Sequence, residues 1–162
     1  MTPVIESGAR PAVSWERATP AIRRIRPSDL GLIAAMHQRL SPESIYLRYF
    51  QCRVPSREEL AIVCHLPPAT GEALVATLPG DEEQIIGLAY YIREKLTSLP
   101  TAELGILVED QLQGQGIGRQ LWQQLHHCAQ ARQISRLRVL SDPGNQRIQH
   151  LIKNSGYTYL AS

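Results

Sequence analysis

The sequence contains few aromatic residues and almost no excess charge. Of its 162 residues, one is Phe and two are Trp, and the formal net charge is +2. Proteins that bind nucleic acid need a strong positive field or aromatic rings on which bases can stack. The composition therefore predicts no nucleic-acid partner, and the chain length is that of one globular domain with a real core.

Long apolar runs are also missing. No stretch approaches the roughly 20 apolar residues that span a bilayer, which predicts no membrane partner. Residues 1–20 carry four charged side chains and no long apolar block, so they do not match a secretory signal. We expect residues 1–20 to form a flexible N-terminal arm and the protein to be cytoplasmic.

Cysteine and histidine are too scattered to predict a disulfide framework or a metal site. The three cysteines, Cys52, Cys64 and Cys128, are an odd number without C-x-x-C spacing, which is typical of free thiols in a reducing compartment. The five histidines form no ligand pattern: His126 and His127 are neighbours on a predicted helix, so their side chains point about 100° apart. We therefore expect no metal cofactor.

Residues 21–162 show the patterns of a single α/β domain. Ser28, Ser41 and Ser56 each stand where a helix can begin, and Glu59 completes a capping box with Ser56. Apolar residues at helical spacing, beginning at Ile117, predict a long amphipathic helix, and a shorter one is predicted after Asn145. Strands are predicted over residues 21–26, 73–78, 85–92, 102–108, 136–139 and 157–160.

The order of these elements predicts the topology of the sheet. Three consecutive strands joined by short turns favour an antiparallel meander, whereas the strand, helix and strand after residue 102 favour a parallel crossover. We therefore expect a mixed, mostly antiparallel central sheet.

The most informative segment is Gln113-Gly114-Gln115-Gly116-Ile117-Gly118, which follows an apolar strand and opens the long helix. Glycines at alternate positions leave backbone N–H groups uncovered, and the start of a helix adds the positive end of its dipole. Such a loop binds a phosphate or pyrophosphate through main-chain atoms.

Spacing excludes the two commonest nucleotide motifs. A G-x-G-x-x-G fingerprint needs glycine at residue 119, where Arg119 stands, and a P-loop needs Lys and Ser or Thr directly after its last glycine. A glycine-rich turn that binds no ligand is the alternative interpretation.

Two motifs resemble the GNAT superfamily of N-acetyltransferases. Gln113-x-x-Gly116-x-Gly118 is similar to its Q/R-x-x-G-x-G/A acetyl-CoA signature, and Asn145, Leu151 and Gly156-Tyr157 are similar to its N-x-x-x-x-x-L-x-x-x-x-G-F/Y segment. The resemblance runs from about residue 21 to the C-terminus. It implies the GNAT fold, with helices on both faces of the sheet, and acetyl-CoA as co-substrate.

A further resemblance concerns the acceptor. The segment LSPESIYLRYF at residues 40–50 resembles L-S-x-x-S-x-Y-x-R-F-F in bacterial protein-lysine acetyltransferases, and Ala102-Glu103-Leu104 resembles the strand whose Glu is their general base. The resemblance thus implies a protein lysine as acceptor and Glu103 as base. A solvated Glu at the edge of a strand is the alternative, and Glu109 and Asp110 are weaker candidates. Arg48 either pairs with a carboxylate or lines the acceptor cleft.

The resemblance also implies a donor site. A backbone N–H of Leu107 or Val108 would hold the oxyanion, and Asn145 would contact the pantetheine arm. The pyrophosphate would be bound by Gln113, Gly114, Gln115, Gly116, Ile117, Gly118 and Arg119.

Two departures from the family pattern affect these expectations. Many members have a Tyr general acid seven residues after the motif Asn, but here that residue is Ile152. The sequence also ends at Ser162, so we expect a short or missing last strand and an open sheet edge that a second copy of the chain can cover, forming a homodimer.

Three functions remain open from the sequence alone. The first is transfer of acetyl groups to protein lysines, and the second is transfer to a small-molecule amine or amino acid. The third is a non-catalytic regulatory module that binds acyl-CoA, which the missing Tyr and the short last strand both favour.

Overall fold

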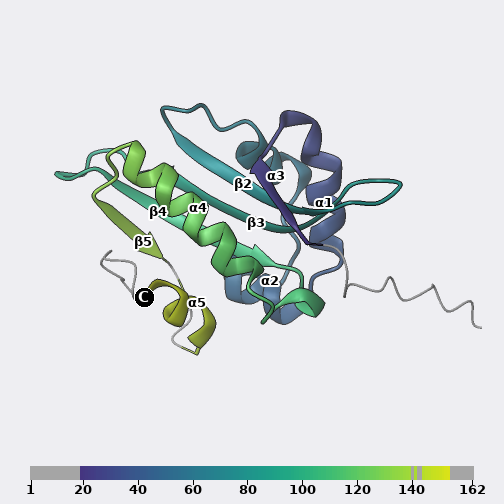
Figure 1. Cartoon of the computed structure of the whole chain (residues 1–162). Coiled ribbons are helices and arrows are strands. Elements are labelled where there is room, and N and C mark those ends of the chain that lie inside the picture. Colours follow the sequence, from purple (N-terminus) through teal and green to yellow (C-terminus); the bar gives the residue numbers. More distant parts are fainter. Residues whose placement is uncertain (1–18, 140, 142–143, 154–162) are drawn as a thin grey trace, which may run out of the picture.

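The computed structural model describes residues 19–139, 141 and 144–153. The chain alternates between helical and extended segments (Figure 1). The N-terminal half contains β1 (Ala21–Arg24), α1 (Leu30–Gln38), α2 (Pro42–Tyr49), α3 (Arg57–Cys64), β2 (Gly71–Leu78) and β3 (Gln84–Arg93). The C-terminal half contains β4 (Thr101–Val108), α4 (Ile117–Ala131), β5 (Arg136–Val139) and α5 (Gln146–Ile152), and short 3-10 turns precede α1 (Pro27–Asp29) and follow β4 (Asp110–Leu112).

The strands form one sheet in the order β1-β2-β3-β4-β5. Each of the first four strands runs antiparallel to its neighbour, whereas β5 runs parallel to β4. The predicted meander and the predicted parallel crossover through α4 are therefore both confirmed. All the predicted strands among the described residues are present, although β1 ends at Arg24 rather than at residue 26.

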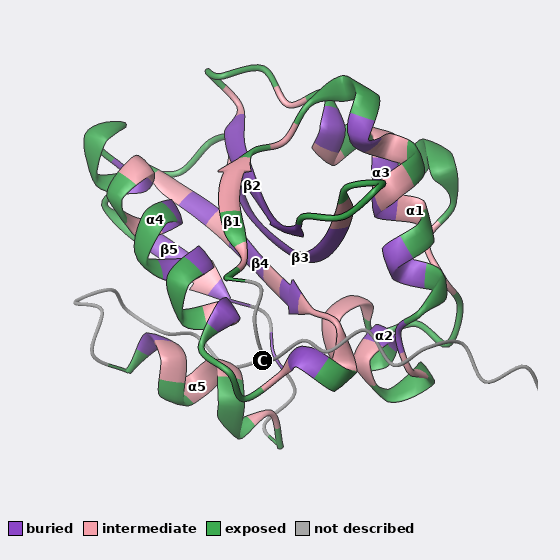
Figure 2. Ribbon diagram, turned by 45° about the vertical axis from the view of Figure 1, so that its right-hand side comes forward, coloured by how far each residue is buried: buried purple, intermediate pink, exposed green. Residues whose placement is uncertain are grey.

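Helices cover both faces of the sheet, as expected. The α4 face is built around side chains such as Leu104 and Leu121, and the opposite face packs against α1 and α3 through residues such as Ile33 and Leu88. The central strands β2 and β3 are buried along almost their whole length between these layers (Figure 2). The sheet is thus a rigid platform, and its two faces have separate cores.

The predicted helix starts are confirmed at two of three positions. Ser41 and Ser56 cap α2 and α3 by accepting hydrogen bonds from backbone N–H groups three residues later. Ser28 is not a cap: it lies inside the 3-10 turn, and α1 begins at Leu30. The reason is Asp29, whose carboxylate accepts the Arg26 N–H at 2.7 Å and pairs with Arg23, so a stronger acceptor organises this turn.

The sheet opens between β4 and β5, and this opening positions the candidate site. The two strands are paired only from Thr101 to Leu104 on β4, opposite Arg136 to Val139 on β5. Beyond Leu104, β4 continues to Val108 with no β5 partner among the described residues. The predicted terminal strand, the glycine at residue 156 and most of the N-terminal arm lie outside the described residues.

Candidate functional site

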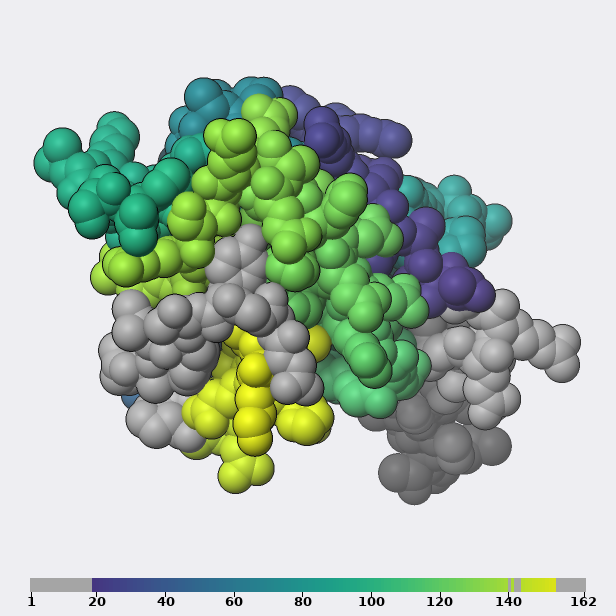
Figure 3. Space-filling view, turned by 60° about the vertical axis from the view of Figure 1, so that its left-hand side comes forward, coloured from purple at the N-terminus to yellow at the C-terminus, as the bar shows by residue number. Residues whose placement is uncertain are grey.

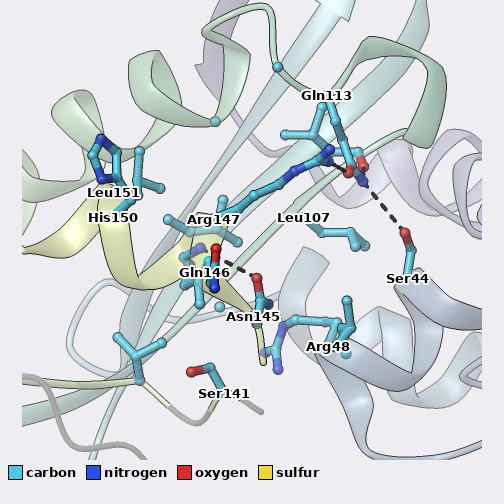
Figure 4. A pocket seen from close by; sticks show the side chains of 18 of the residues that line it. Ser44, Arg48, Leu107, Gln113, Ser141, Asn145, Gln146, Arg147, His150 and Leu151 are labelled. Atoms are coloured by element: carbon cyan, nitrogen blue, oxygen red, sulfur yellow. Dashed lines mark hydrogen bonds between the residues drawn. The ribbon is translucent and has the colours of Figure 1, made fainter. Parts of the chain in front are cut away.

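A cavity of about 1080 Å³ lies where β4 and β5 separate. Its floor is the part of β4 from Leu104 to Val108, where the pairing with β5 ends. Its walls come from three segments: α2, the glycine loop with the start of α4, and α5 with the residues that precede it (Figure 4). In the space-filling view α5, in yellow, lies against the green surface that leads into α4 (Figure 3). The cavity is large enough for an extended cofactor together with an acceptor.

Two of the three motif glycines shape the loop at one end of this cavity. Gly114 and Gly116 have φ angles of +78° and +87°, a left-handed conformation that is costly for other residues. Gly116 is also the N-cap of α4, and no side chain of the described part of the chain caps that helix start. A Cβ atom at either glycine would meet nothing within 4 Å, and the N–H groups of a first helical turn have no acceptor within their own helix.

Gly118 has a different environment from the other two glycines. It lies inside the first turn of α4, and a Cβ atom there would make an ordinary contact, 3.6 Å from Val108. The sequence pattern presents the three glycines as equivalent, but only Gly114 and Gly116 are needed for the backbone conformation. Ile117 is buried in the core and anchors the helix, whereas Gln115 and Arg119 are exposed at the rim.

Gln113 holds the loop in place through its side chain. Its Nε2 donates to the Val108 carbonyl at 2.9 Å and, at 3.5 Å, to the Ser44 hydroxyl, while its Oε1 accepts from Arg147 (Figure 4). The amide therefore joins the loop to β4, α2 and α5. The predicted contact of Gln113 with pyrophosphate stays a prediction, and its side chain is engaged in these protein contacts.

The strand register shows which N–H groups of β4 face the cavity. Glu109 N–H donates to the Ile86 carbonyl at 2.9 Å, and the register pairs Leu107 with Leu88. Because hydrogen-bonded pairs alternate along an antiparallel ladder, the odd-numbered residues of β4 direct their backbone groups toward β3. The N–H groups of Ile106 and Val108 consequently point to the open side.

This alternation distinguishes the two predicted oxyanion donors. The N–H of Leu107 is turned toward β3, so the register favours Val108 and adds Ile106, which the sequence motif did not single out. The Leu107 side chain still lines the cavity. Which β4 residues point their N–H groups toward the cavity depends on how β4 pairs with β3. No local sequence pattern reveals this pairing.

Glu103 is half-buried on β4 and faces the same side of the sheet as Gly105 and Leu107. It pairs across the ladder with Ile92 on β3 and Arg138 on β5. Glu103 is not among the residues that line the cavity, but it directly precedes Leu104, which does. Glu103 thus lies beside the end of the cavity where β4 and β5 are paired.

The two weaker base candidates have structural partners instead. Glu109 forms a two-point ion pair with Arg39, with N–O distances of 2.9 and 3.3 Å. Asp110 accepts hydrogen bonds from the Ser41 N–H at 2.9 Å and from the Ser41 and Ser44 hydroxyls at 2.6 Å each. Burial raises the pKa of Asp110, but these hydrogen bonds outweigh it and leave the pKa below its ordinary value.

Asn145 has a structural role in α5 that its motif position did not reveal. Its Oδ1 accepts the Ile148 N–H at 3.4 Å, so Asn145 caps the helix while also lining the cavity. Ile152, at the position of the usual Tyr acid, is 2% exposed and packs in the core. The side chains that α5 contributes to the cavity include Arg147 and His150, which belong to no motif.

Two charged residues of α2, Glu43 and Arg48, line the cavity, and Arg48 is drawn in Figure 4. Its guanidinium carbon lies 5.0 Å from the ring centroids of both Tyr49 and Tyr90, and Nη2 donates to the Tyr90 hydroxyl. Burial lowers the pKa of Arg48, while nearby Tyr49 and Glu103 oppose that shift. A guanidinium stays charged under these conditions, so the cavity contains a fixed positive charge close to Glu103.

The Tyr49 ring, which lies against Arg48, is held in place by a hydrogen bond to His37. His37 is buried, and its Nδ1 donates to the Ile33 carbonyl at 2.8 Å, which leaves Nε2 to accept from the Tyr49 hydroxyl at 2.7 Å. Burial lowers the pKa of His37, consistent with this neutral tautomer, and also raises the pKa of Tyr49. Arg48 therefore rests on a preorganised aromatic platform.

Among the described residues, the site combines a strand edge left unpaired by β5 with a helix start that has no side-chain cap. The sequence of residues 40–157 matches the family model described as the Acetyltransferase (GNAT) family, and the chain belongs to that family. It is an acetyl-CoA-dependent N-acetyltransferase. Comparison with curated proteins gives no significant match.

Solved structures share this fold at low sequence identity. The GNAT domain of S. lividans PAT is 24% identical with a TM-score of 0.74, and the match covers 93% of this chain and 91% of that one. A GNAT-family acetyltransferase from Streptococcus pneumoniae is 21% identical with a TM-score of 0.69, over 85% and 83% of the two chains. Ribosomal-protein-alanine N-acetyltransferase from Brucella melitensis is 22% identical with a TM-score of 0.67, over 84% and 83%.

The described residues contain neither a metal-binding cluster nor a membrane-spanning helix. No group of three or more His, Cys, Asp or Glu side chains in that part of the chain is arranged to hold a metal ion. None of the helices described here combines the length and apolar character that crossing a bilayer requires.

Proposed function

We propose that the protein transfers the acetyl group of acetyl-CoA to a primary amine, and that a protein lysine is the first candidate acceptor. The observation that carries the proposal is the gap between β4 and β5. It leaves the N–H groups of Ile106 and Val108 facing a cavity that extends from the start of α4 to the neighbourhood of Glu103.

The donor is expected to lie along the exposed edge of β4. The pantetheine arm carries amide groups, which can pair with the free backbone groups of Ile106 and Val108 as an added strand would. The pyrophosphate fits the uncapped start of α4, where Gly114 and Gly116 leave the N–H groups open. Arg119 at the rim adds positive charge there, and Asn145 faces the arm from α5.

The acceptor must lose a proton before it can react. A lysine amine has a reference pKa near 10.4, so about 0.04% is free base at pH 7, a penalty of roughly 4.6 kcal/mol. We assign proton removal to Glu103, which lies beside the end of the cavity where β4 and β5 are paired. Because Glu103 is not among the residues that line the cavity, a bridging water is the expected route.

Acyl transfer then follows the ordinary addition and elimination steps. The amine nitrogen bonds to the thioester carbon, and the carbonyl electron pair moves to oxygen, where the Val108 N–H stabilises the charge. Collapse of this intermediate breaks the carbon–sulfur bond and releases the CoA thiolate. Because residue 152 is Ile, α5 offers no Tyr acid at that position. The proton that the amine nitrogen loses as the amide forms passes through water to the thiolate, whose reference pKa is near 8.5.

The choice of acceptor rests on the resemblance of residues 40–50 to protein-lysine acetyltransferases. That segment forms α2, which is one wall of the cavity, contacts the glycine loop through Ser44, and lines the cavity with Glu43, Ser44, Leu47 and Arg48. PAT, a protein acetyltransferase, and a ribosomal-protein-alanine N-acetyltransferase are among the structures with this fold. A small amino-acid acceptor is the second candidate, because the fixed charge of Arg48 suits a carboxylate.

Acetylation of defined acceptors tests the proposal. The protein is incubated with acetyl-CoA and either lysine peptides or free amines, CoA thiol release is followed, and acetylated products are identified by mass spectrometry. Product from lysine peptides supports the first acceptor, and product from free amines alone supports the second. Tight binding of acetyl-CoA without thiol release for any amine would leave only a regulatory acyl-CoA-binding module.

A further inference from the structure

Arg48 is held against Gly105 of β4 by contacts that fix its position but use few of its hydrogen-bond donors. A Cβ atom at residue 105 would lie 2.7 Å from the guanidinium carbon, so the side chain occupies space that only Gly105 leaves free. The rings of Tyr49 and Tyr90 flank the same group. Strand, rings and hydroxyl together therefore immobilise the guanidinium against β4.

Most donors of this guanidinium have no protein acceptor. Nη2 donates to the Tyr90 hydroxyl, Nε is buried without a partner, and Nη1 makes no hydrogen bond to any described residue. Nη1 is not among the buried unpaired atoms, and the side chain lines the cavity. An arginine that is fixed in position but keeps an unpaired face is preorganised for a planar anionic ligand, above all a carboxylate.

The location of Arg48 separates it from the phosphate-binding end of the site. Gly105 precedes Val108, the last residue of β4, by three positions, or about 10 Å of extended strand. The glycine loop comes after that strand end. Arg48 therefore adjoins the region of the reacting amine rather than the region of the pyrophosphate.

The carboxylate of Glu103 is the second charged group near Arg48. Glu103 and Gly105 face the same side of β4, about 7 Å apart along the strand, so the carboxylate assigned as base is close to the guanidinium. Glu103 is not one of the ion-pair partners of the described residues, yet its charge acts on Arg48. A positive charge beside the reaction centre opposes binding of an isolated ammonium group, but an acceptor that carries its own carboxylate complements both side chains.

We infer that Arg48 is a specificity-determining residue that binds a carboxylate lying close to the acceptor amine. This inference rests on the proposed function and names its substrate class. Two acceptors share that chemistry: a free amino acid, and a lysine next to an acidic residue in a peptide. Lysines in neutral surroundings and simple alkylamines are poor acceptors.

Matched acceptor pairs test the inference on the whole chain with saturating acetyl-CoA. One pair is an acetylated, amidated Glu-Lys dipeptide and its Gln-Lys counterpart, and the other is an amino acid and its primary amide, compared at equal free-base concentration. We expect kcat/KM to be about 10- to 100-fold higher for the carboxylate member of at least one pair, mainly through KM. The pair that shows the preference identifies which acceptor is used.

Variants of Arg48 and of Tyr90, which accepts its hydrogen bond, test whether Arg48 causes the preference for carboxylate acceptors. Arg48→Gln is expected to reduce the preference to about one, Arg48→Lys to retain part of it, and Tyr90→Phe to weaken it, with the affinity for acetyl-CoA unchanged in all three. Arg57→Gln, at an exposed arginine on α3, is the matched control and keeps the full preference. A merely structural role for Arg48 would lower stability and activity for both members of a pair equally.

Other outcomes would overturn the inference. One is a wild-type ratio near one for both pairs while acetyl transfer itself proceeds, which would leave the proposed function intact. Another is an Arg48-dependent preference for succinyl-CoA over butyryl-CoA with neutral amines, which would place the carboxylate on the donor. If no amine is acetylated, calorimetry can still test carboxylate binding by comparing the affinities of an N-acetylated amino acid and its amide in the presence of CoA. Equal affinities would contradict the inference.

Discussion

The side-chain amide of Gln113 donates a hydrogen bond of 2.9 Å to the carbonyl of Val108, which fixes the glycine loop to the end of β4. By strand parity, the N–H of Val108 itself points into the cavity on the same side. One residue pair thus links the phosphate-binding end of the site to the backbone donor expected for the thioester oxygen. The glycine loop and the end of β4 are therefore held together by the protein's own contacts, with no ligand required.

Gln113→Ala should therefore weaken acetyl-CoA binding although its side chain need not touch the ligand. Loss of a typical hydrogen bond corresponds to about 0.5–1.5 kcal/mol, or a 2- to 13-fold rise in the dissociation constant measured by calorimetry. Gln124→Ala is the matched control, because that side chain is exposed on α4 and does not line the cavity. Equal affinities of the two variants would argue against the tether.

The motif glycines should differ in their effect on stability. Gly116→Ala places a side chain at a φ of +87°, and we expect a loss of about 1–2 kcal/mol in the free energy of unfolding together with weaker acetyl-CoA binding. Gly118→Ala lies in the first turn of α4 with room for a methyl group, so its stability should stay equal or rise by up to about 1 kcal/mol. Urea denaturation measures both, and similar losses at the two positions would contradict the distinction.

Asp110 should make the stability of the fold depend on pH. Its folded-state pKa lies below the unfolded value near 3.9, so its contribution is present above that value and is lost as the pH falls toward the folded pKa. Asp110→Asn should cost about 1.5–3 kcal/mol at pH 7, because charge-assisted bonds to Ser41 and Ser44 are lost, and the difference from wild type should shrink below about pH 4.

Denaturation at several pH values checks this prediction. The matched control is Asp81→Asn, at an exposed turn residue between β2 and β3, which should change stability little at any pH. A wild-type advantage that persists unchanged at pH 3 would show that the carboxylate charge is not what stabilises α2.

Removal of the proposed base should show in the pH profile of the reaction. Glu103→Gln should lower kcat/KM at pH 7 by about 10²- to 10⁴-fold, the usual contribution of a general base. The deficit should decrease as the pH approaches the amine pKa near 10.4, where the free amine no longer needs help. Glu82→Gln, in an exposed turn, is the control. Equal profiles for Glu103→Gln and wild type would remove Glu103 from the mechanism.

Local sequence patterns predicted the helix caps and the glycine turn because these features depend on contacts between residues close in the sequence. Ser41 and Ser56 cap their helices through N–H groups three residues away, and Gly116 adopts the positive φ that a glycine permits. The prediction at Ser28 was wrong because Asp29, the next residue, accepts the Arg26 N–H and pairs with Arg23. Caps and turns can be predicted from neighbouring residues, provided that no stronger acceptor in the same segment competes.

The functional detail came from contacts that no local pattern encodes. Arg48 and Tyr90 are 42 residues apart in sequence, and Asp110 reaches back to Ser41 across 69 residues. The parity that points Val108 rather than Leu107 into the cavity depends on the register with β3. Motifs identified the donor loop, whereas the acceptor end of the cavity was assembled only by tertiary packing.

The most direct measurement of the central claim follows the acetyl group itself. Wild-type protein is incubated with isotopically labelled acetyl-CoA and the acceptor panel, and labelled products and free CoA are quantified together by mass spectrometry. We predict one CoA released for each labelled amide formed on an amine, with Glu103→Gln reducing both by the same factor at pH 7. Acetyl-CoA that binds in the β4–β5 gap but yields neither labelled amide nor free CoA with any amine would contradict the account.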